Sequence, residues 1–388
     1  MVFIITQLIF KFAHFDKPAD DFKYYFWNNA NNIQPVGCQF ESLDGKKYVA
    51  DGDINRFGYT PPIYTYLVAG IIIFGGGLNS IFFLNVLLMI LVLLISKKIF
   101  ELITSNQVII YLSLWLMVVN PLFINIPRLY LSEALFSFLT IAAIYFYIVT
   151  LITKTSLPYI IGLFLLIISI ETRAINLYLI PVFAFALVFA KLKIVQKIGL
   201  TVLSIVSFFI LTSISSSESS KYLRRTVADG LSRFEKNPIA NKLYNSVRPH
   251  QENWQITFKD ELILQATENP VAFIKLYSTK FAKSWYATDS GENELFIFIF
   301  QILHLFAFII LLLLYLIRKF RDPKIFLLLL IILYTNIIVM GTLSICRYMS
   351  PIAPLYIFCT VYLGSIIYIK YFSVPSLRLG TSKQSHAE

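Results

Sequence analysis

The chain has 388 residues, of which 57% are hydrophobic, 16% aromatic and only 14% charged, and its mean hydropathy is +0.71. An average soluble domain carries about 25% charged residues, so the composition excludes an ordinary water-soluble protein and predicts an integral membrane protein. The net charge of +11 does not require a nucleic-acid partner, because the positive-inside bias of membrane proteins explains an excess of Lys and Arg. Cys38, Cys346 and Cys359 are too few and too scattered for a disulfide framework or a zinc site.

Apolar runs near the ~20 residues needed to cross a ~30 Å hydrocarbon core recur along most of the chain. These runs must be helices, because a helix satisfies its own backbone hydrogen bonds in lipid. The N-terminal run MVFIITQLIFKFAHF predicts the first spanning helix, since it lacks the positive flank and the cleavage site of a signal peptide. The other predicted spanning helices are 79–96, 106–124, 132–152, 157–172, 174–190, 194–214, 294–317, 325–345 and 351–369.

The segment 61–76, PPIYTYLVAGIIIFGG, could cross the bilayer or lie along its surface. The cations of the short loops decide between these two readings. If the segment lies at the interface, the short loops on one side of the membrane hold only Arg128, Arg173 and Arg347. The short loops on the opposite side then hold ten cations: Lys97, Lys98, Lys154, Lys191, Lys193, Lys197, Arg318, Lys319, Arg321 and Lys324. The positive-inside rule makes the side with the ten cations cytoplasmic. We therefore predict about ten spanning helices plus an interfacial helix.

This topology divides an all-α membrane protein into three parts. Residues 1–214 form an N-terminal membrane module with a first outer loop (16–60) and the interfacial helix (61–76); 215–290 form a second outer loop; and 291–388 form C-terminal membrane helices with a short cytoplasmic tail. Within the second loop, residues 271–285 follow Pro270 and repeat aromatic and apolar side chains at helical spacing. We expect a juxtamembrane helix that lies in the interface or walls a groove for a lipid, and a loop that closes over the site as a lid.

Charged residues gather on the predicted outer face of the membrane. The first outer loop contains Asp20 and Asp21, and the outer ends of different helices carry Arg128, Glu133, Glu171, Arg173 and Arg347. Charges at membrane helix ends are expected to face a bundle interior or a wet cavity. The set therefore predicts a polar site at the outer surface. Any single member could instead snorkel to lipid headgroups or pair with a neighbour.

Ordered motifs along the chain carry a family resemblance. They are DDFKYYFWNNANNI (20–33) with GYTPPIYTYLVAGIIIFGG (58–76), PRLYLSEALF (127–136), ETRAINLYLIP (171–181) and RYMSPIAPLY (347–356). Together they resemble the polytopic GT-C glycosyltransferases, and among these the bacterial branch related to protein O-mannosyltransferases and aminoarabinose transferases. Arg173 is followed by Ala174 where the family shows Arg-Pro, and Asp20-Asp21 stand where its members show Asp-Glu or a lone Asp.

The resemblance implies inverting transfer of a sugar from a polyprenyl-phosphate carrier to a glycan, lipid or protein acceptor, at the periplasmic face of a bacterial inner membrane. The acceptor hydroxyl needs a general base, which we expect to be Asp21 or otherwise Asp20. Glu133 is expected to orient the sugar or the acceptor, or to hold an arginine in place. Asp20 and Asp21 could also simply cap a surface helix.

The departing lipid phosphate needs cations, and the planar fork of Arg binds phosphate oxygens in a bidentate manner. The resemblance implies that Arg347, Arg173 and Arg128 hold this phosphate, with Lys280, Lys283 and Tyr348 as further candidates. No obligatory cofactor and no metal-ligand motif is evident, although the outer acids could bind a divalent cation without a recognisable spacing. We expect membrane lipids as partners and no nucleic acid.

Three other functions remain open at the level of sequence. A lipid-linked oligosaccharide polymerase or ligase would share the donor and could depend on outer arginines without the acidic pair. A flippase or transporter would be expected to show inverted repeats and a site near the midplane. A scaffold without activity predicts that the outer charges are dispensable.

Overall fold

The computed structural model describes residues 1–12, 33–36, 39–42, 62–214, 226–234, 236–247, 258–288, 293–317 and 322–372. Asp20 and Asp21 lie outside the described residues, as does most of the first outer loop. The described parts are helical apart from one short antiparallel hairpin, β1 (Ile33–Val36) and β2 (Gln39–Ser42), in which Ile33 pairs with Ser42. The prediction of a helical membrane protein is confirmed, and the hairpin was not predicted.

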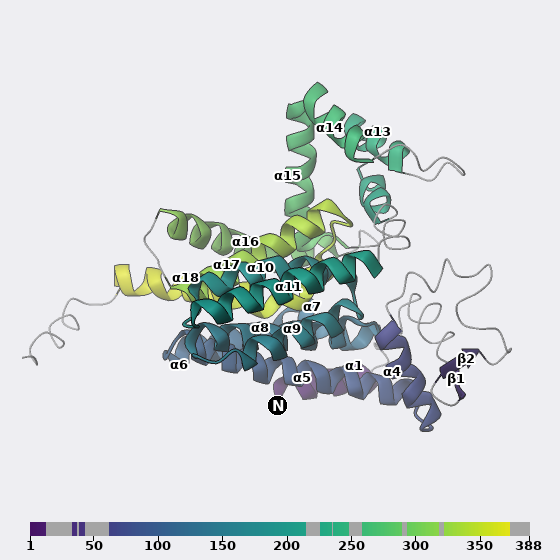
Figure 1. Ribbon diagram of the computed structural model, residues 1–388, viewed down its shortest axis with the longest axis vertical. Helices are drawn as coiled ribbons and strands as arrows, with labels where there is room; N and C mark the ends of the chain where they lie inside the picture. The colour runs from purple at the N-terminus through teal and green to yellow at the C-terminus, as the bar shows by residue number, and fades with distance from the viewer. Residues whose placement is uncertain are drawn as a thin grey trace, which may run out of the picture.

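In the described part of the chain, six helices are long and apolar enough to cross a membrane. They are α5 (Leu78–Ile103), α8 (Glu133–Ile152), α11 (Ile194–Ile214), α16 (Glu294–Leu316), α17 (Pro323–Gly341) and α18 (Ala353–Phe372). A seventh span is formed if α6 (Gln107–Val119) and the segment beginning with α7 (Pro121–Asn125) cross together with a bend of 54°. These helices lie side by side along one direction (Figure 1), as in a multi-pass membrane protein.

The predicted count of ten spanning helices is not confirmed. α1 (Val2–Phe12) has 11 residues and α9 (Leu157–Ile170) has 14, fewer than the ~20 that a span requires. The predicted helix 174–190 is divided into the 3-10 turn Ala174–Tyr178, α10 (Leu179–Ala186) and the 3-10 turn Leu187–Phe189. α4 (Pro62–Ile73) has 12 residues and a length of about 18 Å.

The helix starts follow a simple sequence rule. Proline at the first helical position loses nothing, because its missing N–H would have no helical partner there, and a preceding Asn or Asp accepts bonds from the next amides. Asn120, Asn237, Asn269 and Asp322 each precede a proline, and each side chain accepts a backbone N–H of the helix that follows. These pairs begin α7, α13 (Pro238–Val247), α15 (Pro270–Tyr286) and α17.

A glycine turn ends α4 and starts α5. Gly75 has φ +78°, a left-handed conformation that glycine adopts without steric cost. The Gly75 N–H donates to the Ile72 carbonyl at 2.9 Å, and the Gly76 N–H donates to the Ile71 carbonyl at 2.8 Å. This C-cap satisfies the last carbonyls of the helix and turns the chain into α5.

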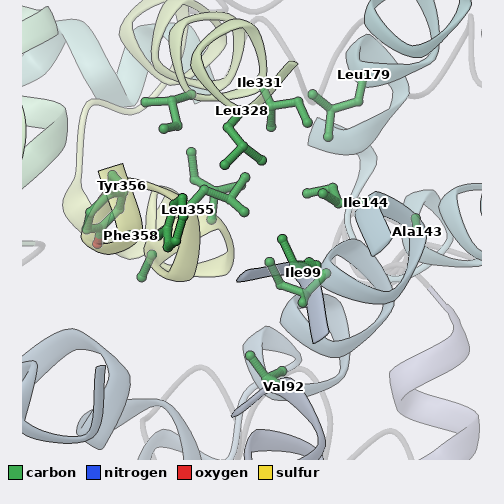
Figure 2. Close-up of a cluster of buried hydrophobic side chains, with 14 of the residues drawn as sticks. Val92, Ile99, Ala143, Ile144, Leu179, Leu328, Ile331, Leu355, Tyr356 and Phe358 are labelled. Atoms are coloured by element: carbon green, nitrogen blue, oxygen red, sulfur yellow. The ribbon is translucent and has the colours of Figure 1, made fainter. Parts of the chain in front are cut away.

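The core lies where α5, α8, α10, α17 and α18 meet (Figure 2). Its fully buried side chains include Val92, Ile99, Ile144, Leu328, Ile331, Leu355 and Phe358, and the rings of Phe100 and Phe358 stack with centroids 4.6 Å apart. Lipid tails are as apolar as these side chains, so close packing rather than escape from water holds such helices together. The packing fixes the helices whose outer ends carry the charged residues.

The predicted second outer loop contains a helical unit, the outer unit, whose contacts with this bundle include the backbone carbonyl of Thr342. α13, α14 (Phe258–Glu268) and α15 share a small apolar core with residues 226–234, and α15 runs across the direction of the membrane helices (Figure 1). A Cβ on Gly230 would lie 2.2 Å from the carbonyl oxygen of Thr342. Lys280 Nζ donates to the same oxygen at 3.2 Å.

Replacing Gly230 by Ala should lower the stability of the protein, because a methyl group there forces the Thr342 backbone to move. We expect a loss of about 1–3 kcal/mol, measured by chemical unfolding in detergent. Gly199→Ala is the matched control, since a Cβ at Gly199 meets nothing within 4 Å. Equal stability of Gly230→Ala and the control would contradict the close approach of the outer unit to Thr342.

Candidate functional site

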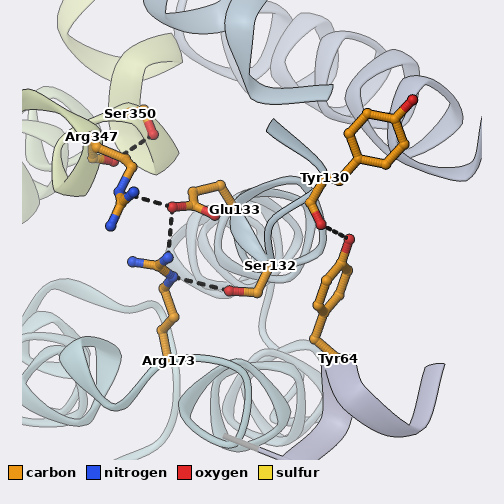
Figure 3. Close-up of polar contacts among 7 residues, drawn as sticks. All are labelled: Tyr64, Tyr130, Ser132, Glu133, Arg173, Arg347 and Ser350. Carbon is orange, nitrogen blue, oxygen red and sulfur yellow. Dashed lines mark hydrogen bonds and ion pairs between the residues drawn. The ribbon is translucent and has the colours of Figure 1, made fainter. Parts of the chain in front are cut away.

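Glu133 lies buried between two arginines at the N-terminal end of α8 (Figure 3). It is the first residue of α8, and its side chain is 1% exposed. Arg173 Nη2 donates to Glu133 Oε1 at 2.6 Å, and Arg347 Nε lies 3.2 Å from the same oxygen. The structure therefore brings together three predicted site residues from the start of α8, the turn after α9 and the turn before α18.

The backbone around Arg173 is fixed by a buried polar network. The Arg173 N–H donates to the Ser169 carbonyl at 2.8 Å, and Asn176 Nδ2 donates to Thr140 Oγ1 and Ser169 Oγ, both at 2.7 Å. The guanidinium also donates from Nε to Ser132 Oγ at 3.1 Å. Because buried polar groups in this network have partners, the turn that carries Arg173 is held rigidly against α8.

Arg347 belongs to the 3-10 turn Cys346–Tyr348, which is tied to the outer unit. The Cys346 N–H donates to the carbonyl of Ala287, just after α15, at 2.8 Å, and Ser350 Oγ donates to the Arg347 carbonyl at 2.6 Å. The ring centroid of Tyr348 lies 5.3 Å from Cζ of Arg173 and 5.7 Å from Cζ of Arg347. Cation–π attraction to both guanidinium groups makes Tyr348 a member of the cluster.

The turn before Glu133 has an unusual backbone. Tyr130 has φ +59°, a left-handed conformation that is uncommon for a bulky residue. The Tyr64 hydroxyl donates to the Tyr130 carbonyl at 2.6 Å, and Lys11 Nζ donates to the Tyr130 hydroxyl at 3.3 Å. Sequence reasoning missed Tyr64 and Tyr130; the lone charge of Lys11 in the first apolar segment was the signal that could have pointed to them.

The accessible surface of this cluster is cationic. The side chains of Arg173 and Arg347 are 17% and 23% exposed, whereas the carboxylate of Glu133 lies beneath them. The N-terminal end of α8 adds a positive partial charge at the same place. Among the described residues, Glu133 Oε2 makes no hydrogen bond. Such an arrangement suits an oxyanion such as phosphate on the arginines, with the carboxylate holding their orientation.

The other predicted residues lie outside the cluster. Within the described part of the chain, the ion pairs of Glu133 are those with Arg173 and Arg347, while Arg128 Nη1 donates to Asn125 Oδ1 at 2.8 Å. Lys280 is fully buried and anchors the Thr342 carbonyl. Lys283 Nζ lies 5.7 Å from the ring centroid of Phe234.

The described residues contain no group of three or more His, Cys, Asp or Glu side chains that could hold a metal ion. The predicted base, Asp21 or Asp20, lies outside them. The described site is a partly exposed cationic surface formed by Arg173, Arg347 and Tyr348 over Glu133.

Comparison with known proteins places the fold. No family model matches the chain, and no curated protein sequence matches it. A solved structure of the archaeal oligosaccharyltransferase AglB from Archaeoglobus fulgidus, in complex with an inhibitory peptide and a dolichol-phosphate, is similar with a TM-score of 0.50 and 12% identity. The fold is GT-C-like. The similarity covers 96% of this chain and 49% of AglB, so the chain spans about half the length of that enzyme.

This GT-C-like fold agrees with the predicted fold class. The similarity does not distinguish the predicted branch of protein O-mannosyltransferases and aminoarabinose transferases. At 12% identity it carries the fold alone, because one fold hosts many activities and function depends on the site.

Glu133→Gln should destabilise the protein, because the two arginines then lie side by side without the carboxylate between them. We expect a loss of about 2 kcal/mol, less than for a fully buried pair since both guanidinium groups reach solvent. Glu101→Gln is the matched control: Glu101 pairs with the partly exposed Lys97 at 3.6 Å and with the exposed Lys98 at 3.0 Å. Chemical unfolding in detergent measures both, and an equal loss in the two variants would contradict a special role of Glu133.

Because of Lys280, the free energy of unfolding should change with pH in the alkaline range. Burial lowers the pKa of Lys280 from 10.5 to about 8, so between these values the unfolded chain binds more protons than the folded chain. The free energy of unfolding therefore rises with pH across this window, whereas Lys280→Met removes the effect. Unfolding in detergent from pH 7 to 10.5 measures the difference between wild type and variant; a difference that does not change with pH would contradict the burial of a titrating Lys280.

Proposed function

We propose that the protein transfers a sugar from a polyprenyl-phosphate carrier to an acceptor at the outer face of the membrane, with inversion at the anomeric carbon. The single observation that supports this most strongly is the pair Arg173 and Arg347 over buried Glu133 at the outer end of the bundle. A multi-pass helical bundle with a GT-C-like fold would place the site next to the membrane, where a lipid carrier is available. AglB, whose structure contains a dolichol-phosphate, is a fold-level parallel for a lipid-linked donor.

In this mechanism the acceptor hydroxyl attacks the anomeric carbon from the face opposite the lipid phosphate. A bond forms between the acceptor oxygen and the anomeric carbon, the bond from that carbon to the phosphate oxygen breaks, and the hydroxyl proton passes to a carboxylate. We assign the carboxylate to Asp21, or otherwise Asp20, as general base. The phosphate leaves as a stable anion, so the second carboxylic acid of glycoside hydrolases is not required.

The arginines act on the leaving group. Arg347 and Arg173 bind the phosphate oxygens and stabilise the charge that develops as the bond breaks. Tyr348 holds the two guanidinium planes, and Glu133 orients them from below rather than acting on the sugar. Arg128, Lys280 and Lys283 remain secondary candidates for the lipid phosphate, each with a contact outside the cluster. The acceptor, the sugar and any divalent metal are not assigned.

Transfer of labelled sugar from a panel of polyprenyl-phosphate donors in reconstituted vesicles tests this function. Asp20/Asp21 changed together to Asn, and Arg347→Ala, should each lower transfer by roughly 100-fold or more while the protein still inserts. Lys242→Ala is the control, because Lys242 lies on α13 with an exposed pair to Glu268 at 3.7 Å. Transfer at the wild-type rate in the double Asn variant would remove the proposed base, and wild-type transfer in Arg347→Ala would remove the proposed phosphate site.

A second candidate is a ligase that transfers a whole lipid-linked oligosaccharide. The fold-level similarity to an oligosaccharyltransferase favours it. The same vesicles distinguish the two functions when donors with one sugar and donors with several sugars are compared. Product from the oligosaccharide donors alone would select the ligase.

A further inference from the structure

The start of α4 contacts both backbone turns that carry the arginine–glutamate cluster. The Ile63 N–H donates to the Glu171 carbonyl at 3.5 Å, two residues before Arg173. The Tyr64 hydroxyl donates to the Tyr130 carbonyl at 2.6 Å, three residues before Glu133. Figure 3 shows Tyr64 on the far side of Ser132 from the two arginines. One short helix is thus placed to set the position of both turns.

The bond from Tyr64 holds a backbone conformation that would otherwise relax. Tyr130 has φ +59° and is 1% exposed, and a left-handed conformation of such a residue persists only when its surroundings fix it. Asn85 Nδ2 donates to the Tyr64 hydroxyl oxygen at 3.4 Å, which directs the hydroxyl proton towards the Tyr130 carbonyl. Tyr64 is fully buried, so bulk water does not replace the bond if the hydroxyl is lost.

A displacement of the Tyr130 turn reaches the arginines through two adjacent residues. Ser132 accepts from Arg173 Nε at 3.1 Å, and Glu133 accepts from Arg173 and faces Arg347. Ser132 and Glu133 lie two and three residues after Tyr130, at the start of α8. If the turn relaxes, Ser132 and Glu133 move together, and both guanidinium groups lose the partner that orients them.

We propose that Tyr64 is a positioning residue for the anion site: its hydroxyl fixes the Tyr130 turn, and through Ser132 and Glu133 it sets the orientation of Arg173 and Arg347. Tyr64 does not touch the bound phosphate in this account. The ligand assignment rests on the proposed function, whereas the effect on the arginines does not.

Tyr64→Phe tests the role by removing one oxygen atom. Tyr159→Phe is the matched control, because Tyr159 is equally buried and its hydroxyl forms a 2.6 Å bond to Ser204 Oγ between α9 and α11. Two readouts are used with the full chain in detergent. The first is the rate at which phenylglyoxal modifies Arg173 and Arg347, followed by peptide mass spectrometry; the second is equilibrium binding of a polyprenyl monophosphate.

We expect Tyr64→Phe to raise the modification rate of both arginines several-fold and to weaken polyprenyl-phosphate binding roughly 5- to 10-fold, while Tyr159→Phe matches wild type in both. Unchanged arginine reactivity in Tyr64→Phe, or an equal change in Tyr159→Phe, overturns the proposal. Raised reactivity in Tyr64→Phe together with no binding by wild type keeps the positioning role and rejects the proposed ligand. If Tyr64→Phe does not fold, Asn85→Leu replaces it with a smaller increase expected, and no increase overturns the proposal.

Discussion

The end of the helix bundle that carries the arginine–glutamate cluster depends on one buried carboxylate. A charge taken out of water at the membrane boundary needs a partner of opposite sign, and Glu133 has two, Arg173 and Arg347. These arginines come from turns that are far apart in the chain, so the ion pairs require the start of α8, the end of α9 and the turn before α18 to meet. The same requirement leaves two guanidinium groups partly exposed above a buried anion.

Each of the three turns is secured by a different part of the molecule. Arg173 is fixed by the buried network around Asn176, and Glu133 follows a left-handed Tyr130 that α4 holds. The turn of Arg347 is tied to Ala287 of the outer unit, and nearby Thr342 receives Lys280 and packs against Gly230. The outer unit therefore contributes to the site through the backbone that precedes Arg347. The buried ammonium group of Lys280 has a partner there in the Thr342 carbonyl.

Much of this arrangement could be predicted from the sequence because charge in an apolar chain is informative. Arg173, Arg347 and Glu133 were expected on one outer surface from the positive-inside rule and helix ends alone, and the structure brings them together. The role of Tyr64 could not be predicted, because a tyrosine in an apolar segment is typical of an interfacial anchor. The partner of the Tyr64 hydroxyl is also a backbone carbonyl, which no sequence pattern indicates. The hairpin of β1 and β2 was missed as well, because IQPV and QFES contain no strong strand signal. The count of ten spans is not confirmed, in part because two 3-10 turns divide the apolar run 174–190, which hydropathy treats as continuous.

We propose that Arg173 and Arg347 recognise the phosphate of a lipid carrier. The most direct measurement is equilibrium binding of a polyprenyl monophosphate and of the matching polyprenol, which lacks the phosphate, to wild type, Arg173→Ala and Arg347→Ala in detergent. The account predicts that wild type binds the phosphate form far more tightly than the alcohol and that each variant loses this preference. Equal affinity of wild type for the two lipids, or an unchanged preference in both variants, would contradict it.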